Sequence, residues 1–237
     1  MDAQSIRVAS YDFSFFAFNG VINVVSKIVS KEEWRAARDE LLVLEKAHTR
    51  ERERLAQLRR DLPRVLLEKD YLLMSEEGAI PLQAVFGDHS QLAVYHLMFG
   101  EEWDTPCVGC TQWADALNGT TNYFKGAGAG LVAVSSAPIE KIMTEKEKRG
   151  WSFTWLSSSS SDFNIDFHGA SNDSNESSRS IGSEKVFFDR GENHGVSIFS
   201  KNDEEQVFHT YSSYNRGIEE LNGAFGYYDL LPNGRQW

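Results

Sequence analysis

The stretch that decides the fold is QLAVYHLMFGEEWDTPCVGCTQWADAL, residues 91–117. It opens with a continuous apolar run, Gln91–Gly100, which has the length and composition of a strand buried on both faces. It closes with residues 111–118, which have the pattern of a helix. Between them lie Cys107 and Cys110, the only two cysteines of the chain, in a C-x-x-C spacing. We therefore expect both cysteines where a buried strand ends and a helix begins.

The segments that follow repeat the alternation of strand and helix. Residues 131–136 (LVAVSS) are a second buried strand, and residues 137–150 are a helix with Pro138 near its start and Gly150 just past its end. Residues 151–158 form a third strand, and residues 195–214 read as two antiparallel strands joined near 201–205. Strands that alternate with helices in this way predict an α/β fold with a central sheet flanked by helices.

A long amphipathic helix is predicted before the sheet. Ser30 and Glu33 form a capping box, and Pro63 ends the helix. Along it one stripe recurs every seven positions, with Trp34, Leu41, His48, Leu55 and Leu62. Its apolar stripe either packs on the domain or pairs with a second copy of the chain. We divide the chain into an N-terminal extension (1–28), a helical arm (29–62) and a domain (63–237). Short strand-like pieces are expected in 65–74 and 80–90, and a mobile Ser/Asn-rich surface loop in about 168–185.

Composition excludes some classes of function. The chain has 237 residues, 41% of them hydrophobic, and a net charge of −11, which argues against nucleic-acid binding. Residues 13–25 are apolar but interrupted, and too short for a membrane span. Two cysteines in so long a chain fit a reducing compartment. We expect a cytoplasmic protein with neither a nucleic-acid nor a membrane partner.

The C-x-x-C loop predicts thiol chemistry. A strand, a C-x-x-C loop and a helix in this order are the arrangement of thioredoxin, in which the helix N-terminus stabilises a thiolate. Cys107 would be the exposed nucleophile, and Cys110 the buried thiol that resolves a mixed disulfide. His96 or His209 would assist proton transfer, and Tyr211 lies near His209 in sequence. The candidate substrate-binding residues are Tyr95, Trp103, Trp113, Ser197 and Arg216. This hypothesis needs no cofactor and takes a disulfide-containing or small-molecule substrate.

Two features of related redox proteins are missing. Thioredoxin-type proteins place a proline opposite the dithiol, before a later strand, but here Val196-Ser197 occupies the matching place. Peroxiredoxins carry Thr or Ser three residues before the peroxidatic cysteine. Here Asp104 precedes Cys107 by three, and Cys107 precedes Cys110 by three, so peroxidase chemistry is disfavoured.

Two other hypotheses stay open. Cys107 and Cys110, with His96 and His209, offer thiolate and imidazole ligands that suit copper or zinc, either as a carrier or as a metalloenzyme acting on a small organic substrate. The protein could instead be a non-redox binding module that dimerises through its N-terminal helix.

The chain from about Val29 onward also resembles a known family. The motifs, in order, are EKDY, YHLMFG, CVGCTQWAD, LVAVSSAP, GWSFTWLSS, SDFNIDF, VFHTYSSYNRG and LNGAFGYYDLLPNGR, after the helix from Val29 to Leu62. This set resembles the thioredoxin-like family catalogued as domain of unknown function number 899. The resemblance implies a thioredoxin-like fold, a dithiol at Cys107 and Cys110, and motif histidines at His96 and His209. The segment before Val29 and the loop from Ala170 to Ser183 depart from that pattern.

Overall fold

The computed structural model describes residues 27–235. Most of the predicted N-terminal extension, residues 1–26, and residues 236–237 lie outside the described part. The elements are α1 (Lys31–Arg60), β1 (Val65–Leu66), β2 (Leu72–Ser75), β3 (Gly78–Pro81), α2 (Leu82–Val85), β4 (Gln91–His96), α3 (Val108–Gly126), β5 (Ala129–Ser135), α4 (Ile139–Arg149), β6 (Thr154–Ser157), α5 (Phe163–Asp166), β7 (Ser178–Ile181), β8 (Glu184–Phe187), β9 (Gly195–Lys201), β10 (Val207–Tyr214), η2 (Asn215–Leu221) and α6 (Gly223–Leu230).

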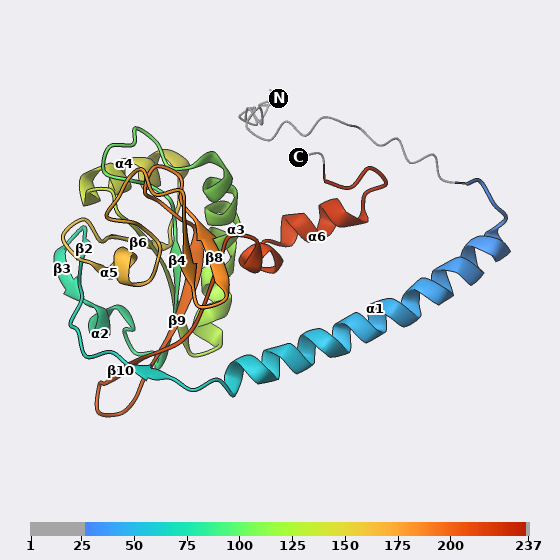
Figure 1. Cartoon of the computed structure of the whole chain (residues 1–237), viewed down its shortest axis with the longest axis horizontal. Helices are drawn as coiled ribbons and strands as arrows, with labels where there is room; N and C mark the ends of the chain where they lie inside the picture. The colour runs from blue at the N-terminus through green and yellow to red at the C-terminus, as the bar shows by residue number, and fades with distance from the viewer. Residues whose placement is uncertain (1–26, 236–237) are drawn as a thin grey trace, which may run out of the picture.

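The main sheet has eight strands in the order β1-β10-β9-β4-β5-β6-β2-β3 (Figure 1). Strand β4 pairs in parallel with β5, and β5 with β6, so α3 and α4 are the crossover helices. On its other side β4 pairs antiparallel with β9, which pairs antiparallel with β10. The set β10-β9-β4-β5, with α3 following β4, makes the fold thioredoxin-like. The central place of β4 explains why all of its residues after Gln91 are buried.

The two faces of the sheet carry separate cores. Successive side chains of a strand point to opposite faces, so Tyr95 and His96 of β4 enter different cores. The core that we call the dithiol-side core lies under α3 and α4 and contains Tyr95, Cys110 and Ile142. The opposite core lies under α2 and α5 and contains Leu92, Val94 and Phe163. The choice of face therefore decides which residues can meet the cysteines.

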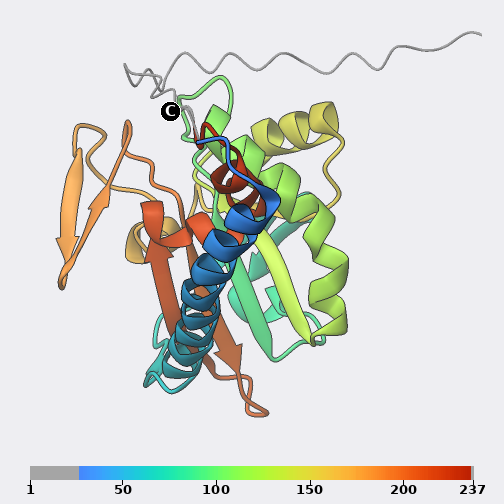
Figure 2. The same cartoon turned by 90° about the vertical axis from the view of Figure 1, so that its right-hand side faces the viewer.

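Helix α1 forms as predicted, with the capping box between Ser30 and Glu33 present. It contributes no buried residue, and it extends away from the sheet (Figures 1 and 2). Its C-terminal half touches the domain where Arg59 lies over the ring of Tyr211 (5.6 Å) and Arg52 approaches Glu220 (3.7 Å). The apolar stripe of α1 does not pack on the domain of its own chain.

The predicted Ser/Asn-rich loop of residues 168–185 is wrong in its second half. Strands β7 and β8 form an antiparallel hairpin there, closed by the two-residue turn Gly182-Ser183. Gly182 has a φ of 57°, which glycine adopts without steric cost. On one side of the hairpin Ile181 and Val186 pack with Phe188 and Tyr214. Polar residues alternate with these apolar ones in the sequence, so the segment did not read as a pair of strands.

A second correction concerns residues 82–85, which were expected to be strand-like. They form the short helix α2, because Pro81 ends β3 and sets an extended backbone immediately before a helical turn. The two antiparallel strands predicted in 195–214 are confirmed as β9 and β10. Among residues 27–235, no helix has the length and apolar character needed to cross a membrane.

Candidate functional site

The two cysteines lie where β4 gives way to α3. The loop returns to the strand end, because the Cys107 amide donates to the Met98 carbonyl (3.0 Å). Helix α3 begins at Val108, and the Cys107 carbonyl accepts from the Thr111 amide (3.0 Å), so Cys107 stands just ahead of the first turn. Both cysteines are free thiols; Cys107 is half-buried and Cys110 is buried. The sequence-based assignment of an outer and an inner thiol matches this placement.

The surroundings give the two thiols opposite ionisation. A hydrogen bond with Cys110, and backbone N–H groups of Cys110 and Gly109, lower the pKa of Cys107 to about 6. Burial and the nearby Asp189 charge oppose this effect. The same thiol–thiol contact and complete burial raise the pKa of Cys110. At neutral pH the outer sulfur is therefore a thiolate and the inner sulfur is a thiol.

Three of the predicted aromatic residues surround the dithiol. Tyr95 lies in the dithiol-side core with Cys110, and its ring stacks with Trp113 at 6.3 Å between centroids. The Tyr95 hydroxyl and the Cys110 thiol lie close enough for each group to shift the pKa of the other. The hydroxyl nevertheless makes no hydrogen bond of good geometry. Trp103 is buried in the same core, and the Arg190 guanidinium lies 3.9 Å from its ring centroid.

The sequence predicts Val196-Ser197 at the place opposite the dithiol, and of these two residues only Val196 lies on the dithiol side of β9. Val196 pairs with Tyr95 across β9 and β4 and packs against the dithiol-side core. No peptide bond in the described range is cis. Gly195, just before it, is tightly enclosed, because a Cβ there would lie 2.3 Å from Cδ1 of Tyr214. A compact backbone at the start of β9 therefore stands where related folds use proline.

The structure does not bring His96 to the dithiol. His96 follows Tyr95 on β4, so its ring enters the opposite core, where it is fully buried. The Asn164 amide nitrogen reaches Ser136 (3.5 Å), which leaves its oxygen to accept from His96 Nδ1 (3.0 Å). His96 Nε2 then accepts from the Ser197 hydroxyl (2.8 Å). Burial lowers the pKa of His96 to about 4, so the ring is neutral at physiological pH.

Ser197 and His209 belong to the same buried chain of hydrogen bonds. Ser197 Oγ is hydrogen-bonded to Ser212 Oγ (2.8 Å), and Ser212 Oγ is hydrogen-bonded to His209 Nε2 (2.7 Å). The His209 ring lies against Phe167 and Phe199 of the opposite core, and burial lowers its pKa. Neither residue faces the cysteines, so the predicted proton transfer from His209 and substrate contact through Ser197 lack the required geometry.

The residues proposed for copper or zinc do not fit a metal. The thiols and the imidazoles lie on different faces of the sheet, and within residues 27–235 no three His, Cys, Asp or Glu side chains are grouped to hold a metal ion.

Tyr211 and Arg216 also lie away from the dithiol. Tyr211 contacts Arg59 of α1, and the exposed Arg216 pairs with Glu219 (3.0 Å). A register shift in β10 between His209 and Tyr211 turns the side chains of His209 and Tyr211 to different faces of the sheet.

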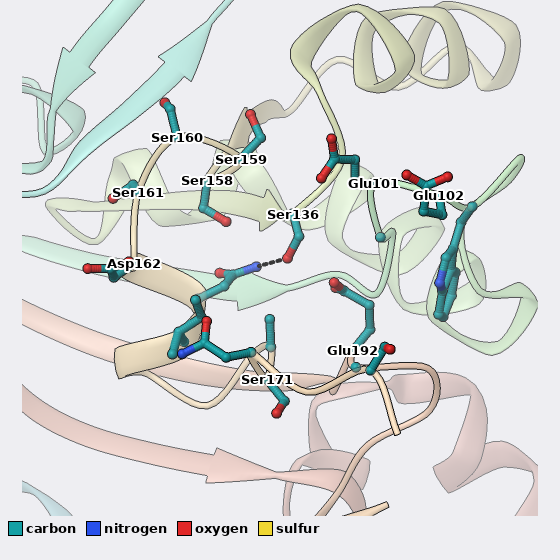
Figure 3. A pocket seen from close by; sticks show the side chains of 18 of the residues that line it. Glu101, Glu102, Ser136, Ser158, Ser159, Ser160, Ser161, Asp162, Ser171 and Glu192 are labelled. Carbon is teal, nitrogen blue, oxygen red and sulfur yellow. Dashed lines mark hydrogen bonds between the residues drawn. The ribbon is translucent and has the colours of Figure 1, made fainter. Parts of the chain in front are cut away.

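Sequence reasoning missed the residues that gather beyond the carboxyl ends of the parallel strands. Ser136 follows β5, Asn164 lies in α5 after β6, and Glu192 comes from the loop before β9; all three line one cavity (Figure 3). Ligands of α/β folds commonly bind at this edge of the sheet, and that rule was the available signal for Ser136. Nothing in the sequence around Glu192 indicates its burial.

A C-x-x-C dithiol at the start of the helix after a central strand defines a thioredoxin-like protein. The chain belongs to the family described as "Bacterial protein of unknown function (DUF899)", whose profile matches residues 24–237. No curated protein matches the chain.

Among solved structures, peroxiredoxin Q of Xanthomonas campestris is similar at 17% identity and a TM-score of 0.46, over 65% of this chain and 85% of that chain. Peroxidoxin BcpB of Mycobacterium tuberculosis is similar at 14% identity and a TM-score of 0.44, over 69% and 91% of the two chains. We take no activity from these likenesses.

Proposed function

We propose that the protein is a thiol–disulfide oxidoreductase that uses Cys107 and Cys110. The observation that carries the proposal is the asymmetry of the pair, since one sulfur is partly accessible and has a lowered pKa while the other is buried and has a raised one. A nucleophile that is ionised at neutral pH, next to a thiol held in reserve, is what disulfide exchange requires.

The reaction follows from this asymmetry. The Cys107 thiolate attacks one sulfur of a substrate disulfide, which forms a mixed disulfide and releases the first substrate thiolate. Cys110 then loses its proton and attacks Cys107 Sγ, which releases the second substrate thiolate and leaves a Cys107–Cys110 disulfide. Two electrons pass to the substrate, and the two released thiolates take up one proton from Cys110 and one from solvent. An external dithiol reduces the protein again.

The remaining features of the proposal follow from the same site. The dithiol acts without a metal or cofactor. Trp103 and Trp113 belong to the same core as the cysteines, and in this proposal their aromatic side chains contact the substrate. A dithiol that must be returned to its reduced state suits the cytoplasm, where we place the protein.

Reduction of insulin disulfides in the presence of dithiothreitol tests this function. The wild-type protein should accelerate the reduction, and Cys107→Ser should lower that acceleration by about 100-fold or more, because it removes the nucleophile. His96→Gln is the matched control, since it alters a buried polar residue on the other face. Equal rates for the wild type and Cys107→Ser would exclude the proposal.

We also propose that α1 pairs with α1 of a second copy of the chain. Its stripe stays exposed within one chain, with Trp34 at 53% and Leu44 at 67% exposure. Within α1 the row Trp34, Leu41, His48 and Leu55 repeats every seven residues, which is typical of a coiled-coil seam that buries such residues against an identical partner helix.

Sedimentation equilibrium tests the pairing. The wild type should be a dimer, and Leu44→Glu combined with Leu58→Glu should be a monomer, because buried like charges oppose association. Val43→Glu, at an equally exposed position beside the stripe, should remain a dimer. A monomeric wild type at high concentration would rule the pairing out.

A further inference from the structure

A cavity of about 840 Å³ opens beyond the carboxyl ends of β4, β5 and β6, and neither cysteine lines it (Figure 3). One wall is the serine-rich turn 158–161 that follows β6, and another is the loop that follows β4. Segments 170–174 and 190–192 close the far side. This serine-rich turn therefore forms part of a concave site at the edge where α/β folds bind ligands.

Glu192 is the buried acid of this cavity. The residue is 5% exposed, and its side chain points toward the cavity (Figure 3). Ser136 and the backbone of Phe99 lie near the carboxyl and act to lower its pKa, whereas Oε2 has no hydrogen-bond partner. Burial raises the pKa of Glu192 to about 8. An unpartnered carboxyl oxygen in a buried position is costly, so a donor from a ligand would satisfy it.

The charges of the wall favour a cation over an anion. Apart from Glu192, which its raised pKa keeps neutral at neutral pH, its acidic residues are Asp70, Glu101, Glu102 and Asp162, and its basic residues are Lys69 and Arg190. Lys69 is already paired with Asp162 (2.7 Å) and with Asp166 (2.8 Å). Arg190 lies over Trp103 and near Asp189 (3.7 Å). The wall is therefore left with excess negative charge, which attracts positively charged ligands and repels phosphates and carboxylates.

The chemistry of the wall suits an ammonium group. An ammonium has three N–H donors and no acceptor, and here a carboxyl oxygen and serine hydroxyl oxygens face the same space (Figure 3). In the described part of the chain these acids are not grouped closely enough to hold a metal ion. Asn164 is held in place by His96 and Ser136, so the floor beside Glu192 is fixed before any ligand arrives.

We propose that this cavity binds a small organic amine, whose ammonium group donates to Glu192 at the floor while the rim carboxylates Glu101 and Glu102 attract it or a second ammonium. The site goes beyond the proposed redox function, and binding there requires neither thiol. A failure of insulin reduction would therefore leave this proposal standing, and the reverse also holds.

Isothermal titration calorimetry near pH 8 with 1,4-diaminobutane tests the site. Butane-1,4-diol and succinate are the matched probes, because they keep the four-carbon length and replace the cations with neutral or negative groups. The diamine should bind, the other two should not, and Glu192→Gln should weaken the diamine by about tenfold or more. The exposed Glu204→Gln, on the β9–β10 turn, should bind like the wild type.

The affinity should also rise as pH increases through about 8, because the Glu192 carboxyl must ionise while the amine stays protonated. No heat with the diamine, equal binding of the diol, or unchanged affinity in Glu192→Gln would each overturn the proposal. If Glu192→Gln does not fold, the double variant Glu101→Gln, Glu102→Gln decides instead. Its exposed positions leave folding intact, its affinity should fall several-fold, and an unchanged affinity would overturn the proposal.

Discussion

One face of the central sheet favours the charged form of a titratable side chain, whereas the other face favours the neutral form. On the dithiol face, free N–H groups at the start of α3 and a neighbouring thiol hold Cys107 as an anion. On the opposite face, His96 is enclosed by Asn164, Ser197 and aromatic rings, and burial keeps it neutral. Hydrogen-bond donors beside the partly exposed Cys107 thus stabilise its thiolate, whereas burial among uncharged partners destabilises the charged form of His96. Residue type alone does not distinguish the two environments.

The sharpest test of this contrast is the reactivity of the thiols. Alkylation of Cys107 by iodoacetamide should accelerate as pH rises through about 6 and then level off, because the thiolate is the reactive form. Cys110, which is 3% exposed, should react about 100-fold more slowly at neutral pH. Mass spectrometry of Cys110→Ser and Cys107→Ser gives each rate separately. A midpoint for Cys107 at the ordinary thiol pKa would remove the contrast.

The buried His96 should lower the free energy of unfolding of the protein in acid. The pKa of His96 is about 4 in the folded protein and 6.5 when unfolded, so the unfolded state binds the extra proton first. The stabilisation is complete above about pH 6.5 and is lost as pH falls toward 4, by about 3 kcal/mol. Urea unfolding at several pH values should show a shallower decline for His96→Gln. Parallel curves for the two proteins would contradict this view of the buried ring.

A third test concerns Glu192, whose carboxyl is buried in the cavity beyond the strand ends. Its pKa is raised to about 8, so the folded state holds a proton that the unfolded state releases, and stability falls as pH rises from about 4.5 to about 8. Glu192→Gln carries no carboxyl at this position, so its free energy of unfolding should lack this fall, which amounts to about 5 kcal/mol by pH 8. Thermal unfolding of both proteins measures it. A variant less stable than the wild type at this pH would show that the carboxyl has a structural role.

Much of the fold and the order of the thiols could be predicted from the sequence. The apolar run of β4 identified a central strand, and the following helix placed Cys107 outside and Cys110 inside. The face of His96 was also within reach, since adjacent strand residues cannot share a face and Tyr95 is its neighbour. The faces of His209 and Tyr211 were not, because a register shift separates them. Glu192 depends on long-range packing of a loop against Gly100, which no local pattern encodes.

Strand β4 carries one residue of each environment in succession, Tyr95 for the dithiol and His96 for the floor of the cavity by way of Asn164. The position of β4 along the sheet therefore affects both sites. A single-residue insertion or deletion before Tyr95 would present the imidazole to the thiols and the phenol to Asn164, and would damage both sites at once. Homologous chains should therefore keep the length of this segment constant. The loops that form the rim of the cavity should vary more, and the ligands that the cavity binds should vary with them.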